Sequence, residues 1–284
     1  MEGRRAFPVN RLSGPLGAAN AILRARSRVH SVRDFPGPLS IKSVTEGTVS
    51  WKTGGRELPV DRDSFLVLNH GEPYSMDIDA PTPVATLCVF FQDGFVESVY
   101  GSMGRAGIEP HSEPTRFSSL LHLADTRILP RMRALADAPA AGRLWLDEQF
   151  LRLARDLLLL NRDLRRRMRL LPARRPATRE ELFRRVRRGQ EYLHGHASAD
   201  LDLAAVARQS CLSPYHFHRS FTRLFGKTPH QYRNELRLAS ARRLIETTAM
   251  TITEICGAVG FESAASFSAL FRRSFGAPPS AVRK

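Results

Sequence analysis

The sequence predicts an α+β protein in which a β-rich N-terminal half precedes a helical C-terminal half. Short apolar runs bounded by turn residues dominate the first half, as expected for an antiparallel sandwich or a small barrel. In the second half the apolar residues recur at the spacing of one helix face. A length of 284 residues with 42% hydrophobic residues is enough for two folded domains.

Turn residues and short apolar runs place the expected strands. The pair Gly54-Gly55 lies between two β-prone runs and predicts a hairpin that follows the segment 41–51. Two further runs, Ser64–Asn69 and Val84–Phe91, have the composition of strands. The proline-containing segment 79–83 has turn chemistry, so the strands are expected to be short.

A helical period is expected from about Thr115, in a segment whose apolar residues are Phe117, Leu120, Leu121, Ala124, Ile128 and Leu135. A second, longer helix is expected over Leu144–Leu171, with one apolar face and one arginine-rich face. The stretch 171–177 contains two prolines and no apolar pattern, which indicates a linker. A further helix is expected from Thr178 to Leu193, beginning with a capping-box pattern.

The net charge of +15 is unevenly distributed. Residues 34–150 carry more acidic than basic side chains, whereas 1–33 and 151–284 are strongly basic. A basic segment implies a polyanionic partner, either nucleic acid or an anionic membrane surface. That inference therefore applies to the C-terminal half and not to the middle of the chain.

Cysteine usage and hydropathy predict the compartment. The three cysteines are far apart and odd in number, which suits free thiols in a reducing cytosol rather than a disulfide framework. No apolar run reaches the length of a membrane-spanning helix, and the basic N-terminus lacks the apolar core of a signal peptide. The sequence thus predicts a cytoplasmic protein with no membrane partner.

An internal repeat occupies the C-terminal region. Residues of one copy recur fifty positions later with the same identity, so that Ser213, Phe217, Phe221, Phe225, Gly226, Pro229 and Arg233 match Ser263, Phe267, Phe271, Phe275, Gly276, Pro279 and Arg283. Two generic helical hairpins would share apolar spacing, but they would not share serines, glycines and prolines. The pattern therefore indicates a duplicated unit.

Each copy has the capping residues of a helix–turn–helix. A polar residue able to cap an N-terminus precedes each of its two helices, and a glycine follows the second helix. The phenylalanines of that second helix lie on one face, which is expected to be core. The residues concerned are Asp202, Ser213 and Gly226 in the first copy and Thr251, Ser263 and Gly276 in the second.

The segment between the copies predicts one long helix that runs to about Thr247. Thr228, Pro229 and Gln231 are the residue types of an N-cap, a first-turn proline and a capping box. Such a helix would be about 28 Å long, close to the roughly 34 Å between successive major-groove faces of B-DNA. Two helix–turn–helix units on this spacer could therefore enter adjacent major-groove turns.

Four motifs carry a family resemblance: SPYHFHRSF, GKTPHQYR, the turn at Gly260-Phe261 and the terminal FG…P pattern. Together they show that residues 180–284 resemble the DNA-binding domain of AraC/XylS-type transcription regulators. The resemblance covers slightly over a third of the chain. It implies seven helices, two helix–turn–helix units and a sequence-specific regulator that is more often an activator.

The resemblance also implies which side chains contact DNA. In that family the exposed face of the second helix of each unit contacts bases, which here are Tyr215, His218, Arg219 and Thr222 in the first unit and Ala264, Ala265, Ser266 and Ser268 in the second. Arg219 is expected to bond a guanine with both ends of its fork. Alanines offer only contact with a thymine methyl, so the first unit is expected to supply most of the discrimination. Phosphate contacts are expected from Arg223, Lys227, Arg237, Arg272 and Arg273.

The β-rich part resembles the cupin-like sensor half of such regulators. On this division residues 1–30 are a basic arm, 31–172 a cupin-like β barrel with flanking helices for sensing or dimerisation, 173–179 a linker and 180–284 the DNA-binding domain. The His-x-His motif of metal-binding cupins is missing, so no metal, cofactor or catalytic residue is expected. A small effector is expected beside Trp51, Phe65, His70, Tyr74 and Phe90, although these residues equally suit an ordinary core.

Three function classes follow. The first is a sequence-specific regulator of transcription, with double-stranded DNA as partner, RNA polymerase as a further partner if it activates, and homodimerisation through the N-terminal half. The second is a non-specific or architectural DNA-binding protein. The third is a cupin-type enzyme fused to a DNA-binding module, which the missing metal ligands disfavour. The target operator, the effector and the sign of regulation do not follow from the sequence.

Overall fold

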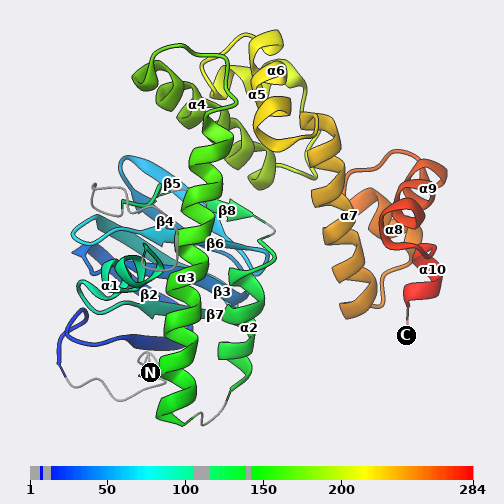
Figure 1. Cartoon of the computed structure of the whole chain (residues 1–284). Helices are drawn as coiled ribbons and strands as arrows, with labels where there is room; N and C mark the ends of the chain where they lie inside the picture. The colour runs from blue at the N-terminus through cyan, green and yellow to red at the C-terminus, as the bar shows by residue number, and fades with distance from the viewer. Residues whose placement is uncertain are drawn as a thin grey trace. The chain divides into compact units, whose positions relative to one another are not determined.

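The computed structural model describes residues 7–8, 14–104, 116–119, 121–123, 125–138 and 142–283. It divides into two compact units, Met1–Leu164 and Arg165–Lys284 (Figure 1). The first is built on antiparallel strands and the second is helical, as the predicted α+β class requires. Within the described residues, no helix is both long and apolar enough to cross a bilayer.

The N-terminal unit is a nearly closed antiparallel β barrel. Along the main path the strands pair in the order β1-β2-β7-β3-β6-β8, while the β4–β5 hairpin attaches to β7. The bounds are β1 Phe7–Pro8, β2 Ala21–Pro36, β3 Ser40–Glu46, β4 Val49–Thr53, β5 Arg56–Val60, β6 Ser64–Leu68, β7 Pro73–Phe90 and β8 Leu121–Leu123. The hairpin expected at Gly54-Gly55 is confirmed, with both glycines at positive φ.

Strand β7 joins the two ends of the barrel. Its first half pairs with β4, its second half with β3, and β2 follows it along the opposite edge. The expectation of a turn at 79–83 was wrong, because β7 continues through this segment. Ser27 pairs with Val84 whereas Val29 pairs with Asp79, so the ladder is irregular where the prolines lie. A proline lacks the N–H that a ladder requires and is tolerated at such a bulge.

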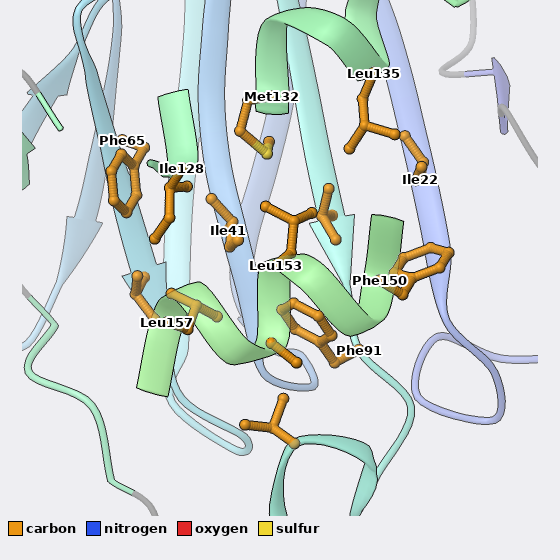
Figure 2. Packing of buried hydrophobic residues seen from close by; sticks show 14 of the residues in the cluster. Ile22, Ile41, Phe65, Phe91, Ile128, Met132, Leu135, Phe150, Leu153 and Leu157 are labelled. Carbon is orange, nitrogen blue, oxygen red and sulfur yellow. The ribbon is translucent and has the colours of Figure 1, made fainter. Parts of the chain in front are cut away.

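Helices cover the outer face of the sheet. Helix α1 spans Phe95–Gly104, α2 Ile128–Asp137 and α3 Arg143–Met168. Figure 2 shows Phe150, Leu153 and Leu157 of α3 directed towards Ile22 and Ile41 of the strands, with Met132 and Leu135 of α2 beside them. The apolar face of α3 is therefore buried against its own sheet.

The barrel interior forms a second core. Trp51, Tyr74 and Met76 lie here with Leu66 and Leu68 and with the remaining apolar residues Val44, Val49, Leu58, Val60, Ile78, Val84 and Leu121. Strand alternation explains the division, because neighbouring residues point to opposite faces. On β6, Phe65 and Val67 pack under the helices while Leu66 and Leu68 point inward.

Two boundaries in this unit differ from those expected. Strand β2 begins at Ala21, so residues assigned to a basic arm extending to residue 30 are part of the sheet. The helix expected from about Thr115 does not form over Leu121–Leu123, which is strand β8 paired with β6. Leu121 is fully buried inside the barrel, and the His122 ring stacks on Phe65 at 4.8 Å on the opposite face. These opposed directions follow a period of two, which the apolar residues alone had not separated from a helix.

Seven helices follow α3 in the described residues, matching the number that the resemblance implied. They are α4 Pro176–Gly195, α5 Leu203–Gln209, α6 Pro214–Phe225, α7 Pro229–Thr247, α8 Ile252–Ala258, α9 Ala264–Phe275 and α10 Pro279–Val282. Helix α3 ends at Met168 and α4 begins at Pro176, so the helix-free connection lies a few residues before 173–179. Thr178 lies inside α4 and does not cap it, because Pro176 takes the first helical position.

Candidate nucleic-acid interface

Helix α6 is fixed at both ends by its own sequence. The Ser213 hydroxyl accepts a hydrogen bond from the His216 backbone N–H at 3.3 Å, and Pro214 occupies the first turn. Gly226 ends the helix in the left-handed conformation, with φ 71°. The predicted caps are thus confirmed, and they set the direction in which α6 leaves the turn after α5.

One face of α6 is anchored in the core. Phe217 and Phe221 are fully buried, with ring centroids 5.4 Å apart. Phe221 also meets the edge of Tyr232 from α7 at 5.5 Å. Because these residues are one turn apart, they fix the rotation of α6 about its axis. His218 and Arg219, which lie between them, are exposed, whereas Ser220 is buried with the phenylalanines.

The outward face of α6 carries the residues predicted to contact bases. Tyr215 is 74% exposed, and His218 and Arg219 are exposed as well. Arg219 has no ion pair or hydrogen bond with any residue that the structure describes, so its guanidinium is available to a ligand. The Thr222 hydroxyl donates to the His218 carbonyl at 2.8 Å and retains only acceptor capacity.

The second unit repeats this construction with shorter side chains. Phe267 and Phe271 are fully buried, Ser263 caps α9, and Gly276 ends it at φ 78°. Of the four residues predicted to contact bases in this unit, Ala264, Ala265 and Ser266 are exposed and Ser268 is half-buried. No long polar side chain lies among these four. The two recognition helices thus match in scaffold and differ in chemistry.

Helix α7 connects the two units. It spans 19 residues, and its capping box of Thr228 and Gln231 is formed, with the Thr228 backbone N–H donating to Gln231 Oε1 at 2.9 Å. Tyr232 packs in the first unit, whereas Leu238 and Ile245 belong to the core of the second. One helix therefore contributes to both cores and fixes the spacing of α6 and α9.

Exposed arginines follow both recognition helices. Arg223 lies in the last turn of α6, and Arg272 and Arg273 lie in the last turn of α9, all exposed. Lys227 differs, because its ammonium is paired with the Glu235 carboxylate. A phosphate would have to compete with that carboxylate for Lys227.

Arg237 differs from the exposed arginines because its guanidinium bonds to backbone carbonyls. Its Nε donates to the Ala197 carbonyl at 2.7 Å and one terminal nitrogen to the Ala199 carbonyl at 3.2 Å. The guanidinium also lies 5.5 Å from the centre of the Phe261 ring. Burial, followed by repulsion from Arg233, lowers its pKa. Arg237 therefore joins α7 to the 197–199 loop, and a phosphate would have to compete with these carbonyls for its guanidinium.

Sequence reasoning missed the structural role of the repeated arginine pair. Arg233 donates to the carbonyls of Ala197 and Leu201 at 3.0 and 3.1 Å, just before α5. Its repeat counterpart Arg283 donates to the Met250 carbonyl, just before α8. Each arginine thus fixes the entry of its own helix–turn–helix unit. Their identity at matching repeat positions was the available signal.

The predicted effector residues do not share one cavity. Trp51 and Tyr74 lie in the barrel interior, and Phe90 is buried with its ring centre 3.9 Å from the Lys42 ammonium. Phe65 points to the helix-covered outer face. His70 is exposed, with Nδ1 3.0 Å from the Asp93 carboxylate. Phe65 and His70 are therefore removed from the proposed lining. Phe65 points to the opposite face of β6 from Leu66, and His70 lies in the turn that follows β6.

A residue that the sequence reasoning overlooked lies inside the barrel. Lys42 of β3 is 1% exposed, and its ammonium donates to the Tyr74 hydroxyl at 2.9 Å. The ammonium lies 4.3 Å from the Tyr74 ring centre and 3.9 Å from that of Phe90. Burial lowers its pKa to about 8. Its position two residues before the inward-facing Val44 was the signal in the sequence.

A search of the described residues finds no group of three or more His, Cys, Asp or Glu side chains that could hold a metal ion. The two cysteines of the helix–turn–helix units differ in environment. Cys256 is buried, as expected for a small core residue. Cys211, in contrast, is exposed and has a positive φ of 51°.

The fold of 176–283 defines a double helix–turn–helix domain, and comparison with known proteins agrees. A family model described as "Helix-turn-helix domain" matches residues 206–284. The chain is 35% identical over 100 residues to the "Arabinose operon regulatory protein" of Escherichia coli strain K12, covering 35% of this chain and 34% of that protein. It is 37% identical over 93 residues to the "HTH-type transcriptional activator RhaS" of Escherichia coli O139:H28 (strain E24377A / ETEC), covering 33% and 34%.

A solved structure described as the DNA-binding domain of AdpA "in complex with a target DNA" is 30% identical, with a TM-score of 0.33, covering 34% of this chain and 88% of that one. The chain spans about a third of the length of the curated relatives that it matches. Its C-terminal region carries a helix–turn–helix domain of the AraC type.

Proposed function

We propose that this protein is a sequence-specific DNA-binding regulator of transcription of the AraC/XylS type. Helices α6 and α9 enter the major groove, and α7 holds them at a fixed separation. The observation that carries the proposal is the exposed face of α6, where Arg219 and His218 point outward while Phe217 and Phe221 anchor the opposite face. The Arg219 guanidinium is thus exposed on the face opposite the core.

The two units are expected to contribute differently to binding. The first supplies most of the base discrimination, since Arg219 can bond a guanine through two parallel hydrogen bonds. The second contributes only short side chains, the methyl groups of Ala264 and Ala265 and the hydroxyls of Ser266 and Ser268. Arg272 and Arg273 hold this unit on the phosphate backbone. Arg223 and, after leaving Glu235, Lys227 do the same for the first unit.

The test begins with the full chain and genomic DNA. Footprinting identifies bound fragments, and the affinity for the best fragment is then compared with that for random duplex over a series of salt concentrations. A specific regulator keeps a ratio of about 10³ or more between the two at physiological salt, although both affinities fall with salt. A ratio near one at every salt concentration would contradict the proposal.

Arg219→Ala with Arg223→Ala as matched control tests the division of roles. Both arginines are exposed on α6, one turn apart. Loss of Arg219 should cost about 1–3 kcal/mol against the preferred base pair and relax specificity there, whereas loss of Arg223 should weaken all sequences alike. A footprint with strong base preference only under α9 would reverse the assignment of the two units.

A second candidate function is a non-specific or architectural DNA-binding protein. The alanine- and serine-rich face of α9 favours it, because half of the interface offers no bidentate hydrogen bonds. The salt series above separates the two candidates. An equal affinity for operator and random DNA, with the usual strong salt dependence, would support the architectural role.

The N-terminal barrel is proposed as the regulatory part. Its interior is lined by apolar residues with a few polar groups, the lining that sites for small effectors have. Activation through RNA polymerase and homodimerisation through the N-terminal half complete the proposal. Size-exclusion chromatography with light scattering tests the dimer, and transcription in vitro with purified polymerase tests the sign of regulation.

A further inference from the structure

The barrel contains one buried amine beside a phenol and a thiol. Lys42 Nζ lies between the rings of Tyr74 and Phe90 and donates to the Tyr74 hydroxyl at 2.9 Å. Cys88 is the cross-strand partner of Lys42 on β7. The surrounding interior residues, Val44, Leu66, Leu68 and Met76, are apolar. Three chemically reactive groups thus share one apolar compartment.

A buried lysine of this kind needs an explanation. Burying an ammonium without a carboxylate is costly, and an apolar residue of similar size would stabilise the barrel. Among the described residues, no carboxylate is paired with Lys42, and its one hydrogen bond is to Tyr74. Apart from that bond, the ammonium faces the Tyr74 and Phe90 rings. The amine is more useful here as a reactive group than as a structural one.

We propose that Lys42 is a covalent effector site that captures a small hydrophobic aldehyde as an imine inside the barrel. This inference rests on the effector-responsive part of the proposed function, but it is read out at Lys42 itself and not through DNA. The compartment selects for an apolar body because its walls are aliphatic and aromatic. The imine carbon would be bonded to Nζ and would therefore lie close to the Tyr74 and Phe90 rings.

The chemical step needs no external oxidant or reductant. The neutral Nζ attacks the carbonyl carbon, the π electron pair moves to oxygen, and one N–H proton passes to that oxygen to give a carbinolamine. The C–O bond then breaks, water leaves, and loss of the second N–H proton leaves the C=N bond. The Tyr74 hydroxyl, in contact with Nζ, is placed to give a proton to the departing oxygen and regain it from nitrogen.

Burial increases the fraction of Lys42 that is a neutral, nucleophilic amine. With its pKa lowered to about 8 by desolvation, Lys42 has on the order of a hundredfold more neutral amine at pH 7.5 than a lysine at the ordinary value. Burial also raises the pKa of Tyr74, so the phenol stays protonated. The same holds for Cys88, whose pKa burial raises before Lys42 partly offsets it. The thiol is thus a weak competitor for the aldehyde.

On this proposal the aldehyde approaches the amine past Phe35, beside Tyr74. The edge of the Phe35 ring covers Tyr74 at 5.8 Å between centroids, and Phe35 is only half-buried. Beside it, the Glu72 carboxylate accepts hydrogen bonds from Thr53 at 3.0 Å and from Asn69 at 3.1 Å. Burial alone would raise the pKa of Glu72, but these bonds and one from Ser119 leave it lowered. An anionic Glu72 here disfavours carboxylate effectors and leaves neutral aldehydes unaffected.

The experiment traps the imine on the full chain. Benzaldehyde or hexanal is added with sodium cyanoborohydride, and peptide mapping by mass spectrometry measures the adduct at each lysine. The chain has only four lysines, so Lys52 and Lys227 are internal references on the same molecule. Lys42 should react roughly tenfold faster than Lys52 at pH 7.5, because burial lowers the pKa of Lys42 to about 8. Lys42→Arg keeps a cation and should lose this adduct alone.

Tyr74→Phe is the second variant. It preserves the ring and should slow the adduct at Lys42 about tenfold or more while leaving Lys52 unchanged. The proposal is overturned if native Lys42 reacts more slowly than Lys52, or reacts only after unfolding. It is also overturned if butyrate raises the melting temperature through Lys42 while no aldehyde adduct forms, which would assign the site to carboxylates. Operator binding by Lys42→Arg, measured in parallel, reports separately on the proposed function.

Discussion

Cys211 and Gly260 occupy the same position in the turns of the two helix–turn–helix units, and both have a positive φ, 51° and 86° respectively. Each follows the first helix of its unit, α5 or α8, and precedes the recognition helix. Glycine adopts this conformation at little cost, whereas a residue with a Cβ is strained by about 1–2 kcal/mol. The first unit thus maintains, with a cysteine, a turn that the second makes with a glycine.

Replacing that cysteine should relieve the strain. We expect Cys211→Gly to change the free energy of unfolding by up to about 1 kcal/mol in the stabilising direction, because the gain in the turn exceeds the added freedom of glycine in the unfolded chain. Denaturant unfolding of the full chain measures it. A destabilisation above about 1 kcal/mol would mean that contacts of the thiol, such as that with Arg188 at 3.8 Å, outweigh the strain.

Gly260 should tolerate no side chain. A Cβ there would lie 2.3 Å from the Ser198 carbonyl oxygen and 2.7 Å from an Arg237 nitrogen, so the backbone would have to move. Gly276→Ala is the matched control, since Gly276 has φ 78° with no atom within 4 Å of the added Cβ. We expect the control to cost about 1 kcal/mol and Gly260→Ala about 3 kcal/mol or more. Equal melting temperatures for the two variants would contradict the close approach.

Substituting two arginines of the DNA-binding domain should have different effects, one on the free energy of unfolding and the other on DNA affinity. Arg237→Ala removes hydrogen bonds to Ala197 and Ala199 and should lower the free energy of unfolding by about 1–3 kcal/mol. Arg272→Ala removes an exposed side chain and should leave stability within about 0.5 kcal/mol. Arg272→Ala should instead reduce the salt slope of DNA binding by about one. The prediction fails if Arg237→Ala unfolds like the wild type and only its DNA affinity falls.

The stability of the barrel should depend on the protonation of Lys42. Because the folded pKa, about 8, is below the ordinary 10.5, the unfolded chain holds the proton more tightly between these values, and stability rises with pH in that window. We expect Lys42→Met to stabilise the protein by at most about 3 kcal/mol below pH 8, an advantage that shrinks as the pH rises toward 10.5.

The measurement needs a background that lacks the neighbouring thiol. Tyr74 and Cys88 face Lys42, and their raised pKa values oppose its effect at the upper end of the window. Unfolding curves of Cys88→Ala with and without Lys42→Met, from pH 7 to pH 9, avoid most of this overlap. A difference between the two variants that does not change with pH would show that Lys42 is not desolvated.

The helical half could be predicted from the sequence because its signals are local. Ser213, Thr228, Thr251 and Ser263 each accept the capping hydrogen bond from their own first turn. Such contacts depend on residues three positions apart and not on the rest of the fold. Asp202 caps α5 in the same way. The helix boundaries were therefore predicted closely without knowledge of tertiary structure.

The barrel was less predictable because its pairing is long-range. The prolines near residue 81 indicate a turn, yet β2 on one side and β3 and β4 on the other hold β7 together across them. Leu121 and His122 fitted a helical period as well as a strand. In the candidate effector site, the alternation of side chains along a strand could have placed Lys42 inside the barrel and Phe65 outside it. That alternation assigns a face only once the inner face of the strand is known.

The buried phenylalanines of α6 and α9 have an evolutionary consequence. Phe217 and Phe221 in one unit, and Phe267 and Phe271 in the other, hold their helices without help from the outward-facing side chains. Mutations on the outward face are therefore nearly free of a folding penalty, and duplicated units can drift apart in DNA preference while keeping one architecture. The contrast between Arg219 and its alanine-rich counterpart is the kind of divergence that this separation permits, and it leaves α9 open to acquiring a new preference by single substitutions.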